Sequence, residues 1–202
     1  MNTNTTTKAN VLPLIINETQ LDKYNILSSI DLTTIPDEIR IVYELSLMSL
    51  NSKQCNEPYE QLLSKLLDVV PNTNKHGWDA YDNIEHPTEY YEFKPSSRTK
   101  NPTATINDDT LDKISKYEVA YSTNKKSWIV LAGINRDIHS FDCIYKFPAH
   151  IFTQSRKEYL LNLFEKNKHK EKQTRATYSI SVKKGIDLCK QFNETYYVWK
   201  RS

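Results

Sequence analysis

The sequence predicts an α/β fold in which helices flank a mixed β-sheet. Two observations support this prediction. Helix-like and strand-like segments alternate along the chain, and residues 127–134, SWIVLAGI, form an unbroken apolar run. A strand that is apolar at every position is typical of a sheet covered on both faces. Helices packed on the two sides of such a sheet give a layered α/β domain.

The elements expected before residue 100 are helices over 36–50 and 57–70 and strands over 77–82 and 89–94. Pro36 and Asp37 are typical residues for a helix start. In the second helix, leucines from Leu62 to Leu67 recur at the i, i+1, i+4, i+5 spacing of one buried helix face. The two strands flank a segment rich in turn-forming residues, which predicts a hairpin.

The second half of the chain is expected to hold further helices and strands. A helix is expected over 107–118, opened by Asp108 or Asp109 as its N-terminal cap. The remaining elements are expected to be strands 127–134 and 141–147, a helix over 156–170, a strand over 176–182, a helix over 184–192 and a strand over 195–200. Residues 11–202 then form a single domain, and residues 1–10 a disordered tail.

Composition excludes several classes of protein. No apolar run approaches the roughly 18 residues of a membrane helix, and the polar N-terminus lacks signal-peptide order. The three cysteines are far apart, which argues against a zinc site or disulfides and favours a reducing cytoplasm. Only three glycines are present, which excludes the glycine-rich nucleotide-binding motifs.

The expected hairpin carries two acids and a lysine that can meet at one point. Side chains alternate along a strand, so Glu92 and Lys94 share a face, and the partner strand brings Asp79 alongside. Asp82 is the alternative to Asp79, although alternation places it on the opposite face. Two adjacent carboxylates repel each other unless a cation lies between them, and Mg²⁺ prefers such oxygen ligands. The group therefore predicts metal-assisted hydrolysis of a phosphodiester, with a cross-strand ion pair as the simpler alternative.

This arrangement resembles the PD-(D/E)xK nuclease superfamily. The resemblance implies that Asp79 and Glu92 are metal ligands and that Lys94 is the catalytic lysine. Many members have a further glutamate on the preceding helix. Glu60 is the candidate for that role here, and Glu57 and Glu44 are the alternatives.

The resemblance extends over about residues 57–134, the expected catalytic core. It implies a restriction-endonuclease-like fold and a Mg²⁺-dependent, sequence-specific endonuclease of double-stranded DNA, most similar to a type II restriction enzyme. A homodimer is expected, because a two-fold protein matches a palindromic site. Trp78 stands where the family motif has a proline. The alternatives are a structure-specific or repair nuclease, such as a junction resolvase, and a catalytically silent DNA-binding protein of the same fold.

Two basic regions are expected to contact DNA. The loop after the triplet contains Ser96, Ser97, Arg98 and Lys100, whose hydroxyls and cations suit phosphates. Residues 166–190 carry eight Lys or Arg against two acids, although the whole chain has a net charge of only +2. Within the basic part, about 155–202, the expected DNA contacts are Arg175, Lys183 and Lys184. An ordinary polar loop and a solvated helix end are the alternatives.

Overall fold

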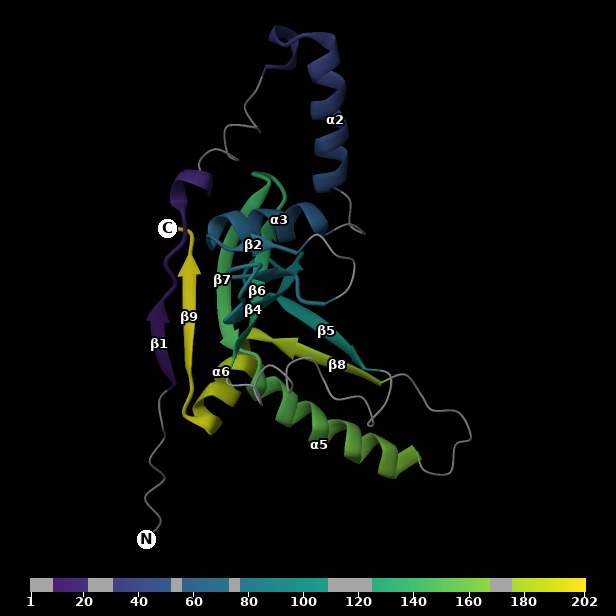
Figure 1. The fold of residues 1–202 in the computed structure, drawn as a ribbon. Coiled ribbons are helices and arrows are strands. Elements are labelled where there is room, and N and C mark those ends of the chain that lie inside the picture. Colours follow the sequence, from purple (N-terminus) through teal and green to yellow (C-terminus); the bar gives the residue numbers. More distant parts are fainter. Residues whose placement is uncertain (1–8, 22–30, 52–55, 73–76, 109–124, 168–175) are drawn as a thin grey trace.

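A computed structural model of the 202-residue chain confirms the α/β class, with helices on both sides of a seven-stranded mixed sheet (Figure 1). The structure describes residues 9–21, 31–51, 56–72, 77–108, 125–167 and 176–202.

The strands are β1 (Asn10–Pro13), β2 (Val70–Pro71), β3 (Ala80–Tyr81), β4 (Glu89–Ser96), β5 (Thr103–Asp108), β6 (Lys126–Asn135), β7 (Ser140–Pro148), β8 (Ala176–Ser181) and β9 (Thr195–Lys200). The helices are α2 (Asp37–Asn51), α3 (Glu57–Leu66), α5 (His150–Asn167) and α6 (Val182–Phe192), together with a short 3₁₀ turn, η1 (Leu32–Thr34).

Strand β6 lies at the middle of the main sheet, whose order is β1-β9-β7-β6-β4-β3-β2. The β4–β6 and β1–β9 pairs are parallel, and the others are antiparallel. Residues 127–134 of β6 are all buried, as their unbroken apolar run predicted. Because β4 lies directly beside this buried strand, its side chains are held on a rigid support.

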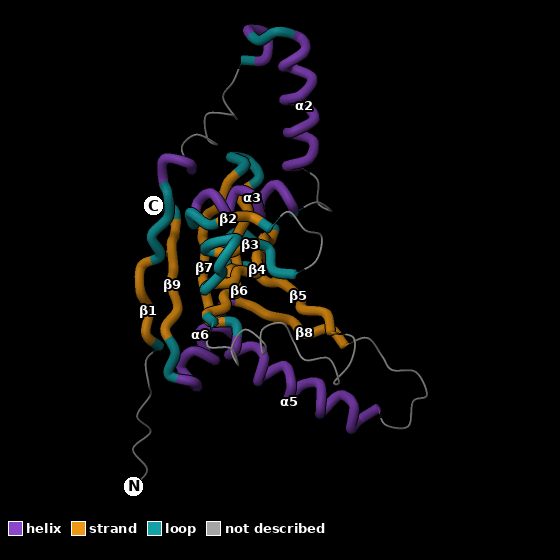
Figure 2. Tube along the Cα trace, viewed as in Figure 1, coloured by secondary structure: helices purple, strands orange, loops and turns teal. Residues whose placement is uncertain are grey.

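Figure 2 shows the helices in purple around the strands of the sheet in orange. Two apolar clusters cover the two faces of the sheet. On one face, Tyr59, Leu62, Leu63 and Leu66 of α3 pack against Tyr91 and Phe93. On the other face, α5 and α6 pack against Ile129, Leu131 and Phe147. The contact with α6 is close, because a Cβ on Gly185 would lie 2.7 Å from the Phe147 ring.

Strands β5 and β8 form a separate two-stranded antiparallel ribbon beside α5. Ile106, Tyr178 and Ile180 anchor it to the core on the α5–α6 side of the sheet. The expected helix over 107–118 is wrong at its start, because Asn107 and Asp108 pair with β8 as strand residues. Pairing with a distant strand overrides the local capping signal there. Residues 109–118 lie outside the described residues.

Several boundaries differ from the predictions. The helix expected over 57–70 ends at Leu66, because Asp68 takes a left-handed conformation at φ 54° and turns the chain into β2. The strand expected over 77–82 is only Ala80–Tyr81. Helix α5 begins at His150, six residues before the expected start. Strand β8 ends at Ser181, which caps α6 by accepting a hydrogen bond from the Lys184 N–H.

The N-terminal segment contains a strand that the sequence did not reveal. Residues 1–10 were expected to form a disordered tail, but Asn10 opens β1, which pairs in parallel with β9. Residues 1–8 lie outside the described part of the chain. Among the helices that the structure describes, none has both the length and the apolar character needed to cross a membrane.

Candidate functional site

Strand β4 presents its acid and its lysine as the alternation predicted. Tyr91 and Phe93 point into the apolar cluster beneath α3. Glu92 and Lys94 point the other way, and the Lys94 ammonium lies 2.6 Å from Oε1 of Glu92. Both side chains are largely buried, with 10% and 22% of their surface exposed. A charge pair withdrawn from water in this way needs further compensation around it.

Asp79 joins this pair through the backbone of β4. The Asp79 N–H donates to the Tyr91 carbonyl oxygen at 2.9 Å. Its carboxylate Oδ2 accepts the Phe93 N–H at 2.6 Å, which places the acid directly beside Glu92 and Lys94. The structure therefore confirms that Asp79 lies beside Glu92 and Lys94, as the sequence predicted.

Asp82, the alternative to Asp79, has a structural role instead. Its Oδ1 accepts the N–H groups of Thr88 and Glu89, both at 2.9 Å, and its Oδ2 accepts the Thr88 hydroxyl. Burial is the largest single influence on the pKa of Asp82 and raises it, but the hydrogen bonds together outweigh it and lower the pKa to about 2. A carboxylate that is stabilised in this way closes the β3–β4 turn.

Glu60 of α3 completes the group. Burial raises the pKa of Glu60 to about 7, and repulsion from Asp79 and Glu92 adds to the effect, while Lys94 opposes it. Glu57 is exposed and adds a smaller repulsion. Glu44 lies on α2, where it pairs with Arg40 at 3.9 Å. Of the three candidate glutamates, Glu60 is the one whose carboxylate lies close enough to interact electrostatically with Asp79, Glu92 and Lys94.

The charges in this group are not balanced. We call the group the acidic cluster, and it consists of Glu60, Asp79, Glu92 and Lys94. Three carboxylates face one ammonium, and two negative charges remain when all four groups are ionised. Burial lowers the pKa of Lys94, but Glu92, Asp79 and Glu60 together raise it above the ordinary value. The lysine is therefore protonated at neutral pH and cannot serve as a base there.

The donor set of the acidic cluster fits a hard divalent cation. Mg²⁺ is commonly held by one or two carboxylates and keeps several of its waters. Asp79 and Glu92 each supply a carboxylate at this point of the fold, and a carboxylate has about four lone-pair sites in all. No group of three or more His, Cys, Asp or Glu already shaped around one ion occurs among the described residues. A cation site made of two carboxylates and completed by water molecules therefore fits these residues best.

A second charged group lies three residues earlier on β4, and sequence reasoning missed it. The Tyr91 hydroxyl and the Trp128 indole N–H donate to Glu89 Oε2 at 2.6 and 3.0 Å. Lys146 lies 3.7 Å from the same oxygen, and Lys126 lies 3.6 Å from Oε1. Burial raises the pKa of Glu89, but these partners outweigh it and hold the pKa below the usual value. We call these five residues the Glu89 group.

The loop after β4 is fixed against the sheet. A Cβ on Gly133 would lie 1.9 Å from the Thr99 carbonyl oxygen, so this approach requires glycine. The Ser96 hydroxyl oxygen accepts the N–H groups of Arg98 and Thr103, so its role is to shape the loop. The other three predicted DNA contacts, Ser97, Arg98 and Lys100, are exposed just beyond the acidic cluster.

The basic C-terminal region is only partly described. Lys183 and Lys184 lie in the first turn of α6, with Lys183 exposed. The Lys184 ammonium lies 3.7 Å from the centroid of the Tyr178 ring, which fixes it beside the β5–β8 ribbon. Arg175 lies outside the described residues, so its predicted role is not tested.

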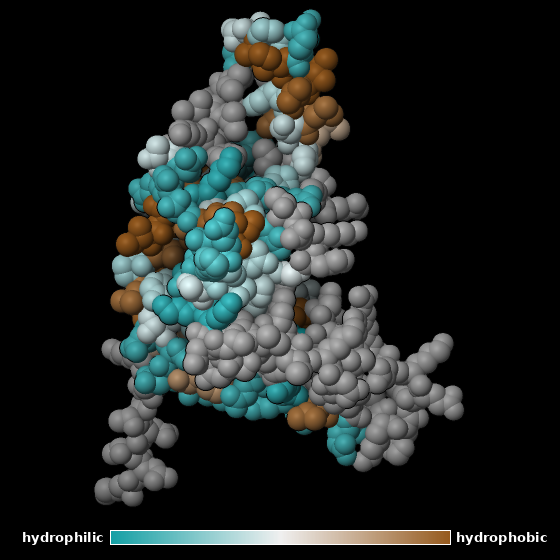
Figure 3. Space-filling view, viewed as in Figure 1, coloured by the Kyte–Doolittle hydropathy of each residue, from teal (hydrophilic) through white to brown (hydrophobic). Residues whose placement is uncertain are grey.

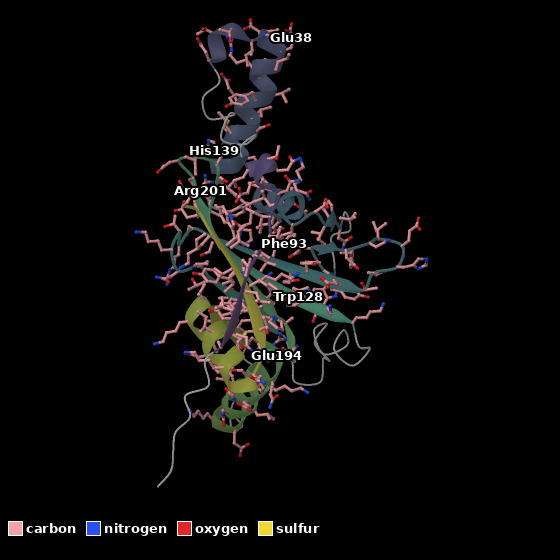
Figure 4. The ribbon with its side chains drawn as sticks, turned by 90° about the vertical axis from the view of Figure 1, so that its left-hand side faces the viewer. Glu38, Phe93, Trp128, His139, Glu194 and Arg201 are labelled. Atoms are coloured by element: carbon pink, nitrogen blue, oxygen red, sulfur yellow. The ribbon has the colours of Figure 1, made fainter. Side chains whose placement is uncertain are left out.

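A cavity of about 300 Å³ lies at the opposite end of β6 from the loop that holds Arg98. One side of the cavity has the pair His150 and Glu194, whose Nε2 and Oε1 atoms are 2.8 Å apart, at hydrogen-bond distance. Figure 4 labels Trp128 and Glu194, which line it. The lining residues are Lys125, Lys126, Ser127, Trp128, Pro148, His150 and Glu194, so the cavity does not include the acidic cluster.

Comparisons with protein families, curated proteins and solved structures found no match for this chain.

Proposed function

We propose that the chain is a Mg²⁺-dependent endonuclease of double-stranded DNA with a restriction-endonuclease-like fold. The observation that carries this proposal is the acidic cluster, in which Glu60, Asp79 and Glu92 face the single ammonium of Lys94. The excess of negative charge favours a divalent cation, and the lysine beside it suits a reaction in which a phosphate gains charge.

Asp79 and Glu92 would hold the cation. When bound, Mg²⁺ lowers the pKa of a water ligand and stabilises charge on phosphate oxygens. Asp79 is oriented by the Phe93 N–H, and Glu92 by Lys94, so neither carboxylate has to reorganise before it binds the ion.

Lys94 and Glu60 have different roles in this proposal. Lys94 stays protonated at neutral pH and stabilises negative charge on the phosphate that is attacked. Glu60 has a pKa of about 7 in the absence of a cation, close to the value that favours proton exchange with a water. It is therefore placed to accept a proton from the attacking water.

The surroundings of the cluster support DNA as the substrate. Ser97, Arg98 and Lys100 are exposed on the rigid loop that follows Lys94, where they can position phosphates. Lys183 extends the positive surface to the first turn of α6. A two-stranded ribbon such as β5–β8 has the dimensions that a major groove admits. Among the possible nuclease activities, we favour site-specific cleavage of both DNA strands, as in a type II restriction enzyme.

Incubation of the purified protein with plasmid DNA and Mg²⁺ tests the proposal. Discrete fragments are expected, and they should be absent in EDTA and with Lys94→Ala. Lys126→Ala is the matched control, because the Lys126 side chain is 71% exposed and lies outside the cluster. Cleavage of branched DNA alone would indicate a structure-specific nuclease. DNA that stays intact under all conditions would indicate a silent DNA-binding protein and would overturn the catalytic proposal.

A further inference from the structure

Helix α2 projects from the body of the molecule and exposes an apolar stripe along its length. Figure 1 shows the helix standing beyond the sheet, and Figure 3 shows apolar side chains gathered on it. The stripe consists of Ile41, Val42, Leu45 and Met48, which are 56%, 63%, 60% and 69% exposed. Their spacing of three and four residues places all four on one side of the helix. We call these four residues the α2 stripe.

The other side of α2 is not exposed in the same way. Arg40, Tyr43 and Leu47 are half-buried and lie on the side away from Leu45. Arg40 also pairs with Asp37 at 2.7 Å along the helix. The apolar residues of the stripe are therefore more exposed than the residues on the other side of the helix, which is the reverse of the usual arrangement.

The stripe is large enough to be an interface. Four side chains of this size at about 60% exposure present roughly 450 Å² of contiguous apolar surface, which is within the range of functional patches. Two such surfaces facing each other would bury on the order of 1,000 Å² once flanking residues are included, which is enough for a weak, concentration-dependent dimer.

We propose that the α2 stripe is the contact between two copies of this chain, with their α2 helices packed antiparallel about a two-fold axis at Leu45. Val42 and Met48 lie three residues before and after Leu45. In an antiparallel pair, Leu45 therefore meets Leu45 of the second copy, and Val42 meets its Met48. A surface that is complementary to itself in this way fits a closed two-fold dimer.

The charges on α2 favour this orientation. Glu38 lies on the same side of the helix as the stripe, near the outer end that Figure 4 labels. A parallel pair would place the two Glu38 carboxylates against each other. An antiparallel pair separates them by about 21 Å along the helix axis, because each lies seven residues from Leu45 and the rise is about 1.5 Å per residue. Antiparallel helix dipoles also attract one another.

Sedimentation equilibrium of the full chain, from about 1 to 200 μM, tests the proposal. The wild type should show a reversible monomer–dimer equilibrium. Leu45→Glu should weaken the dimer at least about 30-fold, because it places two carboxylates at the centre of the contact. The matched control is Ile39→Glu, an equally exposed position at 58% that lies about 120° around the helix from Leu45. It should change dimerisation by less than about threefold.

Cross-linking gives a second measurement that does not require dimer disruption. In a Cys55→Ser background, the remaining cysteines Cys143 and Cys189 are buried. Leu45→Cys should then form a disulfide-linked dimer on mild oxidation, while Ile39→Cys should not. The proposal is overturned if the wild type remains a monomer up to about 200 μM. It is equally overturned if both glutamate variants act alike, or if a dimer survives Leu45→Glu and Leu45→Cys does not cross-link.

Discussion

Strand β4 carries two acid–lysine groups that have opposite electrostatic balance. The Glu89 group surrounds one carboxylate with two lysines and with hydrogen-bond donors from Tyr91 and Trp128. The acidic cluster surrounds one lysine with three carboxylates. The pKa of Glu89 falls below its ordinary value, while the pKa of Glu60 rises to about 7. The two groups lie on the same strand, yet only the second has an excess of negative charge.

This difference separates a structural charge group from a candidate functional one. In the Glu89 group, the partners compensate the buried carboxylate, so its contribution is to stability. In the acidic cluster, the fold holds like charges close together, and that arrangement is costly unless a cation joins them. Strongly perturbed carboxylates in such a setting are typical of functional sites.

Removing a charged side chain from the acidic cluster should abolish catalysis. We expect Glu92→Ala and Lys94→Ala each to reduce DNA cleavage by at least about 100-fold, because they remove metal binding and phosphate stabilisation. DNA affinity should stay within about tenfold, since these groups act on chemistry more than on binding. Single-turnover cleavage and a DNA-binding titration measure the two effects. Parent-like cleavage by either variant would contradict the assignment of the site.

Removing the carboxylate of the Glu89 group should instead cost stability. Glu89→Ala leaves Lys146, which is 15% exposed, without its ion-pair partner. We expect the free energy of unfolding to fall by about 3 kcal/mol, because a buried charge is left uncompensated. Urea denaturation of Glu89→Ala and Glu92→Ala should show the contrast, since Glu92→Ala removes repulsion as well as a pair. An equal loss of stability in both variants would remove the distinction between the two groups.

Because the pKa of Glu60 is raised in the folded chain, the free energy of unfolding should depend on pH. Between about pH 4.5 and 7, the unfolded chain has lost the Glu60 proton while the folded chain retains it, so stability falls as the pH rises through this window. We expect Glu60→Gln to raise the free energy of unfolding by about 1 kcal/mol at pH 8 without metal, after allowance for its partial exposure. The gain should vanish near pH 4.5. Urea titrations at the two pH values measure it, and a gain independent of pH would contradict the shift.

The smallest effect concerns DNA contacts far from the chemistry. Lys183→Ala combined with Lys184→Ala should weaken DNA binding and reduce the slope of log K against log salt by about one for each lost phosphate contact. The sequence that is cut should not change. Lys126→Ala, outside this surface, is the control. If the salt slope stays at the wild-type value, these lysines form only a solvated helix end.

The sequence predicted the acidic cluster better than its surroundings. The alternation of side chains along a strand and the expected hairpin were enough to predict that Asp79, Glu92 and Lys94 lie together. Both features are local properties of the chain. The Glu89 group could not be predicted, because its partners come from distant parts of the sequence. Trp128 lies on β6, which pairs with β4, and Lys146 lies on β7, one strand further across the sheet.

The missed elements have a similar cause. Strand β1 is four residues long and exists by pairing with β9 at the far end of the sequence. Asn107 and Asp108 looked like a helix start but pair with β8. The exposed α2 stripe was also beyond prediction, because apolar spacing marks one side of a helix without saying whether that side faces the core.

Calorimetric titration of the metal-free protein with Ca²⁺ tests whether the acidic cluster binds a cation, and it needs neither DNA nor turnover. We expect binding that releases protons at pH 7, since a cation beside Glu60 lowers its raised pKa. Asp79→Asn should abolish this binding, whereas Asp82→Asn, which changes the β3–β4 turn, should preserve it. No binding up to about 20 mM, or binding unaffected by Asp79→Asn, would contradict the assignment of the acidic cluster as a cation site.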